Sequence, residues 1–372
     1  MRTARGESMV GRRFEAEVGP VAHGGHCVAR VEGRAVFVRH ALPGEQVLIE
    51  ITEGTEGDRF WRADAVEVRR PSPDRVEAPC RYAGPGLCGG CDFQHVALDA
   101  QRRLKAAVVR EQLQRLAGLD LPVEVESVPG DADGLRWRTR QRYVELPDGR
   151  RGMRQHRSHE VVVVDECLLE APEGPRLEVR GEHFTVPGGG FWQVHPGAPE
   201  ALVDAVLAAL APQPGERALD LYAGVGLFSR FLRSAVGPDG AVAAIEGDAR
   251  AMKAAARTTP DLFTRAGDVA DVLAGQMPPE WDVADVVVLD PPRTGAKRAV
   301  VEQVVARQPR AVAYVACDPA ALARDVAIFA EHGYGLSDLR AFDLFPMTHH
   351  VECVALLTPR GGPDPQTVDW TR

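Results

Sequence analysis

The second half of the chain alternates between strand-like and helix-like segments, and no other feature constrains its fold as strongly. Short apolar runs such as VVVL at 286–289 and AVAYVA at 311–316 predict buried strands. Longer segments with apolar residues at helical spacing separate them, among them LFSRFLRSAV at 227–236. Strands joined by helices predict a parallel, doubly wound sheet. Residues 336–359 hold two strand-like runs without a helix between them, so we expect an antiparallel hairpin to close the sheet.

The first part of the chain has a different pattern. Apolar and polar residues alternate at period two, as in EQVLIEI at 45–51, which predicts a small closed β-barrel of the oligonucleotide-binding type. The proline-rich stretch RRPSPDRVEAP at 69–79 indicates a linker. We therefore expect a flexible tail at 1–10, the barrel at 11–70, a central α+β domain at 75–185, the domain with the parallel sheet at 186–360, and a flexible tail at 361–372.

Composition and charge limit the class of protein. The N-terminal sequence lacks the apolar core of a signal peptide, and no apolar run reaches the roughly 18 residues of a membrane span, so we expect a cytoplasmic protein without a membrane partner. The net charge of −9 argues against nucleic acid, but eight arginines and two acids lie between Arg136 and Arg157. Such a local stripe can neutralise RNA phosphates, because salt screens more distant charges. A solvated strand face is the alternative.

The stretch LDLYAGVGLFS at 219–229 is typical of a nucleotide site. Asp220 stands near a strand end, and Gly224 and Gly226 allow a tight turn where the backbone can approach a ligand. Glu246 ends the next strand, where its carboxylate can bind both ribose hydroxyls. The steric needs of the turn could explain the glycines alone, and the pattern suits either S-adenosylmethionine or NAD.

The loop VLDPPR at 288–293 favours S-adenosylmethionine. Pro291 and Pro292 lack backbone donors and make the loop rigid, so carbonyl groups and the Asp290 carboxylate can face a substrate. Methyltransferases that act on planar nitrogens or bases commonly have such a loop, whereas hydride transfer has no evident need for it.

Cys317 follows the next strand, at the carboxyl edge where doubly wound sheets bind ligands. It could be a small core residue, but a thiolate there could add to carbon 6 of uracil and activate carbon 5 for attack on a methyl sulfonium. The adduct must then lose the proton on carbon 5 to a general base. Glu352, in the closing hairpin, is the best candidate, and the alternative is an outward-facing carboxylate.

Four cysteines form a further group. Cys80, Cys88 and Cys91 have the spacing C-x7-C-x2-C, and Cys167 follows later in the chain. This pattern predicts a metal site, with zinc and iron–sulfur both open on spacing alone. Unrelated buried thiols are the alternative.

The chain resembles the RNA uracil-5 methyltransferases over nearly its whole length, and the motifs that carry the resemblance are FWQVH, LDLYAGVGLFS, AAIEGD, LDPPRTG, YVACDPAALARD and FPMTHHVE. The resemblance implies Cys317 as nucleophile and Glu352 as base. It implies that S-adenosylmethionine is bound around the glycine turn by Gln193, Tyr222, Glu246, Asp268 and Asp290. It also implies a TRAM barrel in the first 70 residues, and a 4Fe-4S cluster rather than zinc at Cys80, Cys88, Cys91 and Cys167.

The expected fold is thus multidomain α/β: a Rossmann-like class I methyltransferase domain, an N-terminal TRAM barrel and a central iron–sulfur domain. Three features depart from the family's pattern, namely Ala316 and Asp318 around the cysteine, His195 after the motif glutamine, and Leu227 in the glycine loop. Asp318 would raise the pKa of the Cys317 thiol unless it is paired or turned away.

The expected function is methylation of uridine carbon 5 in structured RNA, with 23S rRNA favoured over tRNA, by a monomer without an obligate protein partner. One alternative is an RNA cytosine-5 methyltransferase. Those enzymes commonly carry a cysteine beside the proline of the DPP loop, and this loop has none. The other alternative is a catalytically silent iron–sulfur protein that binds RNA.

Overall fold

The computed structural model describes residues 6–361, which form two compact units. Within these residues the first unit holds 6–108, 131–172 and 345–350, and the second holds 109–130, 173–344 and 351–361. Most of the expected tails at 1–10 and 361–372 lies outside the described residues. Among the described residues, no helix is long and apolar enough to cross a membrane.

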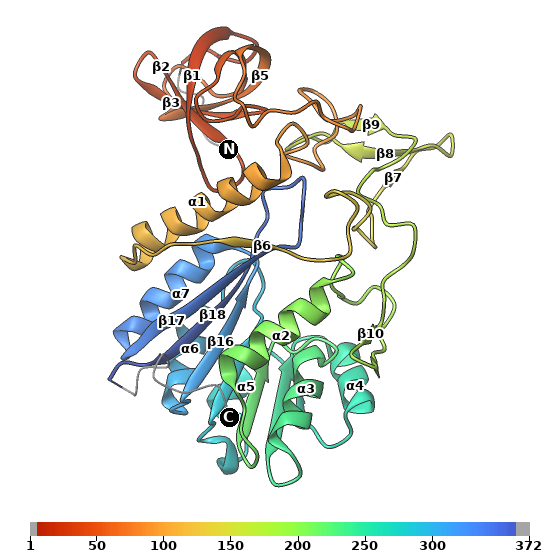
Figure 1. Cartoon of the computed structure of the whole chain (residues 1–372), viewed down its shortest axis with the longest axis vertical. Coiled ribbons are helices and arrows are strands. Elements are labelled where there is room, and N and C mark those ends of the chain that lie inside the picture. The colour runs from red at the N-terminus through yellow and green to blue at the C-terminus, as the bar shows by residue number, and fades with distance from the viewer. Residues whose placement is uncertain (1–5, 362–372) are drawn as a thin grey trace. The chain divides into compact units, whose positions relative to one another are not determined.

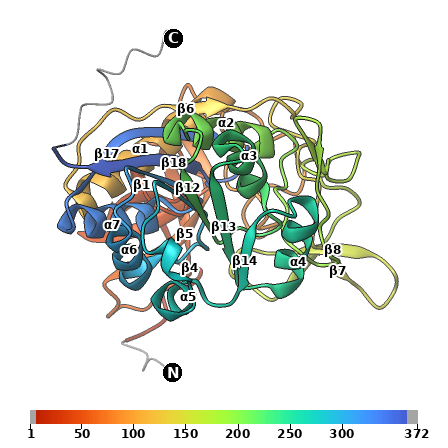
Figure 2. The same ribbon diagram turned by 90° about the horizontal axis from the view of Figure 1, so that it is seen from below.

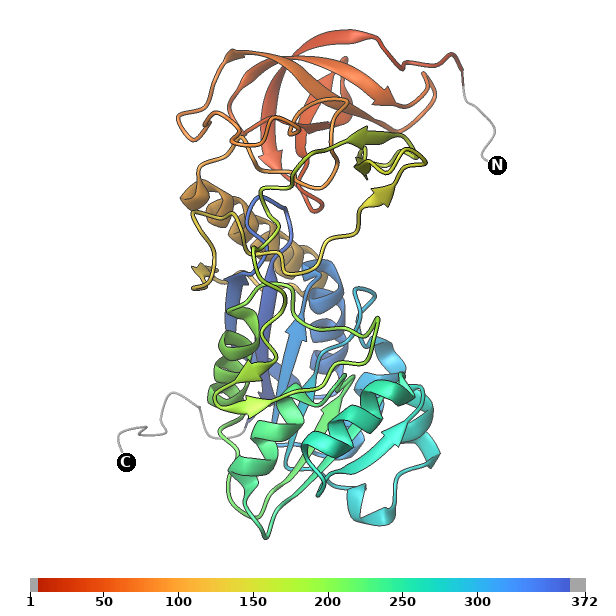
Figure 3. The same ribbon diagram turned by 90° about the vertical axis from the view of Figure 1, so that its right-hand side faces the viewer.

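The first unit begins with a closed five-stranded barrel, in red to orange in Figures 1 and 3. Val36 and Val38 point into its core, while Phe37 between them lies half-exposed, which is the period of two that the sequence predicts. The barrel prediction is therefore confirmed. The strands close in the order β1-β2-β3-β5-β4. Their bounds are Arg13–Val21 for β1, Cys27–Val31 for β2, Arg34–Arg39 for β3, Gln46–Glu53 for β4 and Phe60–Arg70 for β5.

The remainder of the first unit is mostly irregular, with a small sheet of β7 (Val144–Glu145), β8 (Arg151–Arg154) and β9 (Val161–Val163). Helix α1 (Leu98–Ala117) begins in this unit and ends in the second. The chain leaves it at Gly118, whose φ of 69° is a left-handed conformation that glycine adopts without strain.

An eight-stranded sheet forms the centre of the second unit, in the order β14-β13-β12-β15-β16-β18-β17-β6. The first five of these strands run parallel, and β18 pairs antiparallel with both β16 and β17, so the predicted closing hairpin is present. Figure 2 shows β12, β13 and β14 side by side. The bounds are Val125–Ser127 for β6, Arg217–Leu221 for β12, Ala241–Glu246 for β13, Phe263–Ala266 for β14, Val286–Leu289 for β15, Ala311–Ala316 for β16, Tyr334–Asp343 for β17 and Glu352–Pro359 for β18.

Helices cover both faces of this sheet, as a doubly wound fold requires. Helix α3 packs between α2 and α4, and these three helices also contact the strands. Helix α6 packs between α5 and α7, and these three helices form a second row. The second row packs with Leu219, Val287 and Tyr314 in an apolar core where Cys353 is fully buried. The bounds are Ala198–Leu210 for α2, Leu227–Val236 for α3, Ala249–Thr258 for α4, Val269–Gly275 for α5, Lys297–Ala306 for α6 and Pro319–Glu331 for α7. Two short elements complete the unit: the hairpin of β10 (Glu178–Val179) with β11 (Glu182–His183), and a 3₁₀ turn at Pro279–Trp281.

Candidate active site

Five side chains that the sequence singles out gather at one edge of the sheet in the second unit. Asp220 lies in β12, Glu246 ends β13, Asp290 follows β15 and Cys317 follows β16. Because β18 is antiparallel to β16, the register brings Glu352, the first residue of β18, to the end of β16. This is the carboxyl edge where doubly wound sheets bind ligands.

The thiol of Cys317 is half-buried and carries its proton at neutral pH. Burial raises its pKa to about 12, and the carboxyls of Glu352 and Asp290 add to the rise, while the Arg293 guanidinium opposes it. Glu352 is only 4% exposed, and burial together with Asp290 holds its pKa well above the usual range, again opposed by Arg293. Arg293 therefore acts on both groups in the same direction, toward their ionised forms.

Asp318, the acid beside the cysteine, caps the helix that follows. Its Oδ1 accepts the backbone N–H of Ala321 at 2.8 Å, and Pro319 occupies the first turn of α7, where a missing N–H does no harm. Among the causes that raise the pKa of Cys317, Asp318 contributes less than burial, Glu352 or Asp290. Asp318, which departs from the family's pattern, therefore serves as the capping residue at the start of α7.

The turn after β12 is as tight as the sequence predicts. Gly224 and Gly226 have φ values of 56° and 85°, and a Cβ on Gly226 would stand 2.9 Å from the Cβ of Ala255. Only glycine fits that position without displacing α4. Tyr222 is also left-handed, with φ of 63°, which is uncommon for a residue with a side chain.

Two carboxylates are held firmly beside this turn. Glu246 accepts the backbone N–H of Gly224 on Oε2 at 2.9 Å and that of Asp248 on Oε1 at 2.8 Å. Asp220 accepts the backbone N–H and the hydroxyl of Ser229 on one oxygen, at 2.8 and 2.5 Å. Burial raises the pKa of Asp220 to about 7 against these hydrogen bonds, with Glu246 adding to the rise.

Asp290 completes the acidic group. Its pKa is raised to about 7, first by burial and then by the neighbouring carboxyls of Asp220 and Glu246. Carboxyls so close together suppress one another's ionisation in the absence of a cation. The edge of the sheet therefore holds a cluster of partly protonated acids. Binding of a positively charged ligand would favour their ionised forms.

Two further predicted cofactor residues lie apart from these strand ends. Asp268 caps α5, and its Oδ1 accepts the backbone N–H groups of Ala270 at 2.9 Å and Asp271 at 3.3 Å. It neighbours Tyr222, whose pKa is raised to about 12 by burial and then by the Asp268 carboxylate. Gln193 is half-buried in the segment before α2. Their contacts with the cofactor stay predictions.

The loop after Asp290 is held by a residue that the sequence analysis missed. Oδ2 of Asp325, on α7, accepts the backbone N–H of Ala296 at 2.7 Å and the hydroxyl of Tyr314 at 2.5 Å. A Cβ on Gly295 would stand 2.6 Å from the same oxygen. The sequence held one signal for this role, because Asp325 is a lone acid between Leu322 and Phe329 on the apolar face of a helix.

All four predicted metal-binding cysteines of the first unit line one small cavity: Cys80, Cys88, Cys91 and Cys167. Amide groups donate to three of the sulfurs, from Gly90 N to Cys88 at 3.4 Å, from Gln94 Nε2 to Cys91 at 3.4 Å and from Gln141 Nε2 to Cys167 at 3.0 Å. Within residues 6–361, no three His, Cys, Asp or Glu side chains are placed to hold a single metal ion.

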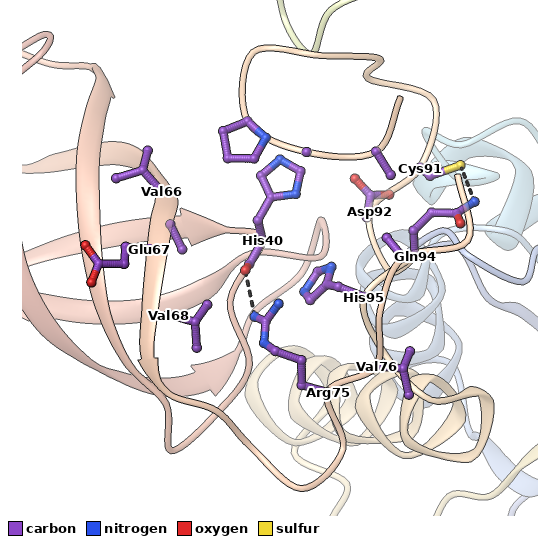
Figure 4. Close-up of a pocket in the computed structure, with 15 residues that line it drawn as sticks. His40, Val66, Glu67, Val68, Arg75, Val76, Cys91, Asp92, Gln94 and His95 are labelled. Carbon is purple, nitrogen blue, oxygen red and sulfur yellow. Dashed lines mark hydrogen bonds between the residues drawn. The ribbon is translucent and has the colours of Figure 1, made fainter. Parts of the chain in front are cut away.

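The segment around Cys91 is anchored within the first unit (Figure 4). Gln94, which donates to Cys91, lies beside His95, and Arg75 donates to the carbonyl of His40 at 2.8 Å. Arg75 also forms an ion pair with the fully buried Glu45, at 2.5 Å. Buried charges of this kind need a partner, so this pair fixes the linker against the barrel.

The arginine stripe between Arg136 and Arg157 is partly neutralised. At least four of its eight members have acidic neighbours, in the pairs Arg136–Glu166, Arg150–Asp148, Arg151–Glu170 and Arg157–Glu53. The four arginine side chains are 43–63% exposed. Such exposed ion pairs contribute little to stability and can be exchanged for phosphate contacts.

Comparisons with known proteins agree with this architecture. A family model described as TRAM domain matches residues 7–66, and one described as tRNA (Uracil-5-)-methyltransferase matches residues 277–360. The fold resembles a crystal structure of the Pyrococcus abyssi tRNA (uracil-54, C5)-methyltransferase in complex with S-adenosyl-L-homocysteine, with a TM-score of 0.67 and 21% identity over 92% of this chain and 99% of that one.

Two curated relatives are similar over almost their whole length. An uncharacterized RNA methyltransferase of Streptomyces avermitilis is 45% identical over 94% of this chain and 99% of its own. The 23S rRNA (uracil(1939)-C(5))-methyltransferase RlmD of Halomonas elongata is 32% identical over 93% of this chain and 89% of its own. With these relatives, a class I methyltransferase sheet and an N-terminal TRAM barrel, the chain belongs to the RNA uracil-5 methyltransferase family.

Proposed function

We propose that this protein methylates carbon 5 of a uridine in 23S rRNA through a covalent adduct with Cys317. The observation that carries the proposal is the register of β16 and β18, which sets Glu352 at the strand end that presents Cys317. A thiol and a carboxyl at the ligand-binding edge of the sheet are the two groups that this reaction needs from the protein.

Cys317 acts as the nucleophile. Its thiolate forms a bond to carbon 6 of the uracil, and the electrons of the 5,6 double bond move into an enolate on carbon 4. Carbon 5 would then bond to the methyl carbon of S-adenosylmethionine, while the bond from that carbon to the positively charged sulfur breaks with its electrons going to sulfur, so that S-adenosylhomocysteine leaves. Arg293 lowers the pKa of Cys317 and so favours the thiolate that the first step requires.

Glu352 acts as the base that ends the reaction. It takes the proton from carbon 5, the 5,6 double bond re-forms, and the bond from Cys317 to carbon 6 breaks with the electrons returning to sulfur. The carboxyl must be ionised at that moment, which its buried position opposes and Arg293 favours. Burial also keeps water from competing for the base.

The methyl donor fits the acidic edge of the sheet. Glu246 already uses both oxygens to hold the turn, and their remaining lone pairs can accept the ribose hydroxyls. Gly224 and Gly226 let the backbone approach the ligand. Asp290 faces the positive charge on the sulfur of the ligand. The binding site is completed by Asp268, Tyr222 and Gln193. The acids Asp220 and Asp290, which burial holds near half-ionisation at pH 7, suit a ligand that carries a positive charge.

We also propose that the cysteine cavity holds a 4Fe-4S cluster. Four thiols line one cavity, and four cysteine ligands are the usual set for such a cluster. Amide donors to three sulfurs would stabilise thiolate ligands. The cluster would hold the irregular part of the first unit together, since methyl transfer itself moves no electron.

The names of two relatives support 23S rRNA as the proposed substrate. RlmD proteins of Halomonas elongata and Shewanella are 32% and 30% identical to this chain over at least 90% of its length, and both are named for uracil 1939 of 23S rRNA. The family model and the Pyrococcus structure carry tRNA in their names, which makes tRNA the second substrate to test.

One experiment tests both the reaction and the RNA. The full chain is incubated with labelled S-adenosylmethionine and with 23S rRNA or tRNA transcripts. We expect transfer to 23S rRNA, none with Cys317→Ala, and a denaturant-resistant protein–RNA adduct with Glu352→Gln. Cys27→Ala, which alters a buried thiol of the barrel, should retain transfer. Full transfer by Cys317→Ala would disprove the mechanism, and transfer to tRNA alone would reassign the substrate.

A further inference from the structure

The first unit contains a cavity of about 650 Å³ that the proposed reaction does not use. Its walls come from the outer face of the barrel and from two loops. The lining residues include His26, Arg39 and Arg62 of the barrel, Leu87 of the cysteine loop and His156 after β8. Its size is within the range of pockets that hold small organic ligands, about 300–1,000 Å³.

Three buried nitrogens in this cavity have unused hydrogen-bonding capacity. Nε2 of His26, Nε2 of His156 and Nη2 of Arg39 are shielded from solvent and find no hydrogen-bond partner within residues 6–361. Arg39 and His26 are each less than one-tenth exposed. Because buried polar groups are almost always paired, these nitrogens indicate a ligand with donors and acceptors of its own.

The charges around the cavity favour a neutral ligand. Arg13 pairs with Glu50 at 2.8 Å, and Arg62 and Arg157 both face Glu53, at 3.3 and 3.5 Å. The other acids that face the imidazoles are Asp92, 3.8 Å from Arg39, and Asp64, opposite Arg39 in the strand register. Burial lowers the pKa of both His26 and His156 to about 4, so the two imidazoles are uncharged at neutral pH.

An aromatic and guanidinium surface adjoins the cavity, because the lining residues Arg62 and His26 both contact Phe37. Phe37 and Phe60 meet edge to face with ring centres 5.3 Å apart, and the Arg62 guanidinium lies 5.7 and 5.4 Å from the two centres. His26 contacts Phe37 in turn, at 6.4 Å. Phe60 is 40% exposed, so part of its ring is open to a ligand. Such surfaces stack nucleobases, whatever the base, in proteins that bind single-stranded RNA.

We infer that this cavity receives one unstacked base of the RNA, distinct from the uridine that is methylated. The base would stack on Phe37, Phe60 and Arg62 and take hydrogen bonds from His26, Arg39 and His156. A nucleobase is planar and neutral and carries both donors and acceptors, as the site requires. The inference rests on the proposed function only in taking RNA as the substrate.

Binding of fluorescein-labelled oligouridylate and oligoadenylate to the full chain tests the inference. Phe60→Leu and His156→Ala should each weaken binding at least about fivefold, the loss expected for one stacked base. Val283→Ala and His183→Ala, exposed residues elsewhere in the chain, are the matched controls and should bind as the wild type does. Unchanged affinity in both cavity variants would overturn the inference.

Two further readouts separate a base from a phosphate and locate the contact. The dependence of affinity on salt should keep its slope in Phe60→Leu and His156→Ala, whereas a shallower slope would show that the cavity binds phosphate instead. Photocrosslinking of 5-bromouridine RNA should label peptides within 26–39, 60–66 or 155–158, and labelling only elsewhere would refute the site.

The failure of this inference and that of the proposed function are distinguishable. Binding is measured without a methyl donor, so a protein that transfers no methyl group could still show the predicted losses. Conversely, a protein that methylates RNA while both cavity variants bind normally would leave the proposed function intact and remove only the second base site.

Discussion

The hydroxyl of Tyr314 donates a hydrogen bond of 2.5 Å to Oδ2 of Asp325, and this buried pair ties β16 to the loop after Asp290. The same carboxylate oxygen accepts the backbone N–H groups of Ala296 at 2.7 Å and Lys297 at 3.2 Å. Tyr314 lies on β16, three residues before Cys317, and the loop carries Arg293. One carboxylate therefore holds together the elements that carry the nucleophile and its neighbouring cation.

Replacing Asp325 should destabilise the second unit. Asp325→Ala removes the acceptor of the buried Tyr314 hydroxyl and of the part-buried Lys297 N–H, and leaves the Ala296 N–H with only the Tyr314 oxygen, 3.0 Å away. We expect a loss of about 2–4 kcal/mol in the free energy of unfolding, since each buried orphan costs about 1–3 kcal/mol. Urea denaturation measures the loss. Asp338→Ala, at an exposed position of β17, should change stability by less than about 0.5 kcal/mol. Equal stability of the two variants would contradict this account of Asp325.

The reactivity of Cys317 should depend on its two charged neighbours in opposite ways. Because the thiolate is the reactive form and its pKa lies near 12, alkylation by iodoacetamide should accelerate continuously from pH 7 to 10 without a plateau. Glu352→Gln removes a cause of the high pKa and should speed alkylation, whereas Arg293→Gln should slow it. Peptide mass spectrometry follows Cys317, with buried Cys353 as the internal control. A plateau below pH 9 would show that the thiol is already activated.

The roles of Asp318 can be separated by two substitutions. Asp318→Asn keeps an N-cap acceptor for Ala321 and removes the charge, so stability should hold while Cys317 alkylation becomes faster. Asp318→Ala also removes the charge but loses the cap, at a cost of about 1 kcal/mol in the free energy of unfolding. Thermal unfolding and alkylation rates are measured for both variants. An Asn variant as unstable as the Ala variant would contradict the capping role.

Binding of the methyl donor should strengthen as pH rises through 7. Asp290 has a pKa of about 7, so it is neutral below and ionised above this pH, and only the ionised form attracts the sulfonium. From pH 6 to 8 the affinity for S-adenosylmethionine should rise by up to about tenfold, which corresponds to one pKa unit of coupling. S-adenosylhomocysteine, whose sulfur is uncharged, serves as the control ligand in calorimetry. The dependence should weaken in Asp290→Asn, which leaves only the contribution of Asp220; equal pH profiles for the two ligands would exclude a charge interaction.

The cysteine cavity should yield a coloured protein. Purification without oxygen should give a brown protein with iron and sulfide in equal amounts, and Cys91→Ser should lose both. Cys27→Ser, which alters a buried thiol of the barrel core, should retain them. A colourless protein with one zinc per chain would reject the iron–sulfur cluster.

Much of the fold follows from patterns within short stretches of sequence. The period of two in the first strands and the alternation of apolar runs with helices predicted the barrel, the doubly wound sheet and its closing hairpin. Other elements carried too little signal. The strand Phe263–Ala266 is short and half-exposed, and Val125–Ser127 becomes a strand only by pairing with β17. Because Val125–Ser127 pairs with β17, the residues near 125 belong to the second unit, although the sequence pattern grouped them with the central domain.

The sequence by itself determined which residue types stand at the ends of the strands, because a strand, a glycine turn and a helix cap each depend on a few neighbouring residues. It thereby named Asp220, Glu246, Asp290 and Cys317 as a group. Only the tertiary structure decided that Glu352 reaches Cys317, since this depends on the register of two strands far apart in the chain. The hold of Asp325 on the Ala296 loop and the gathering of four cysteines around one cavity likewise depend on packing between distant segments, which no local pattern encodes.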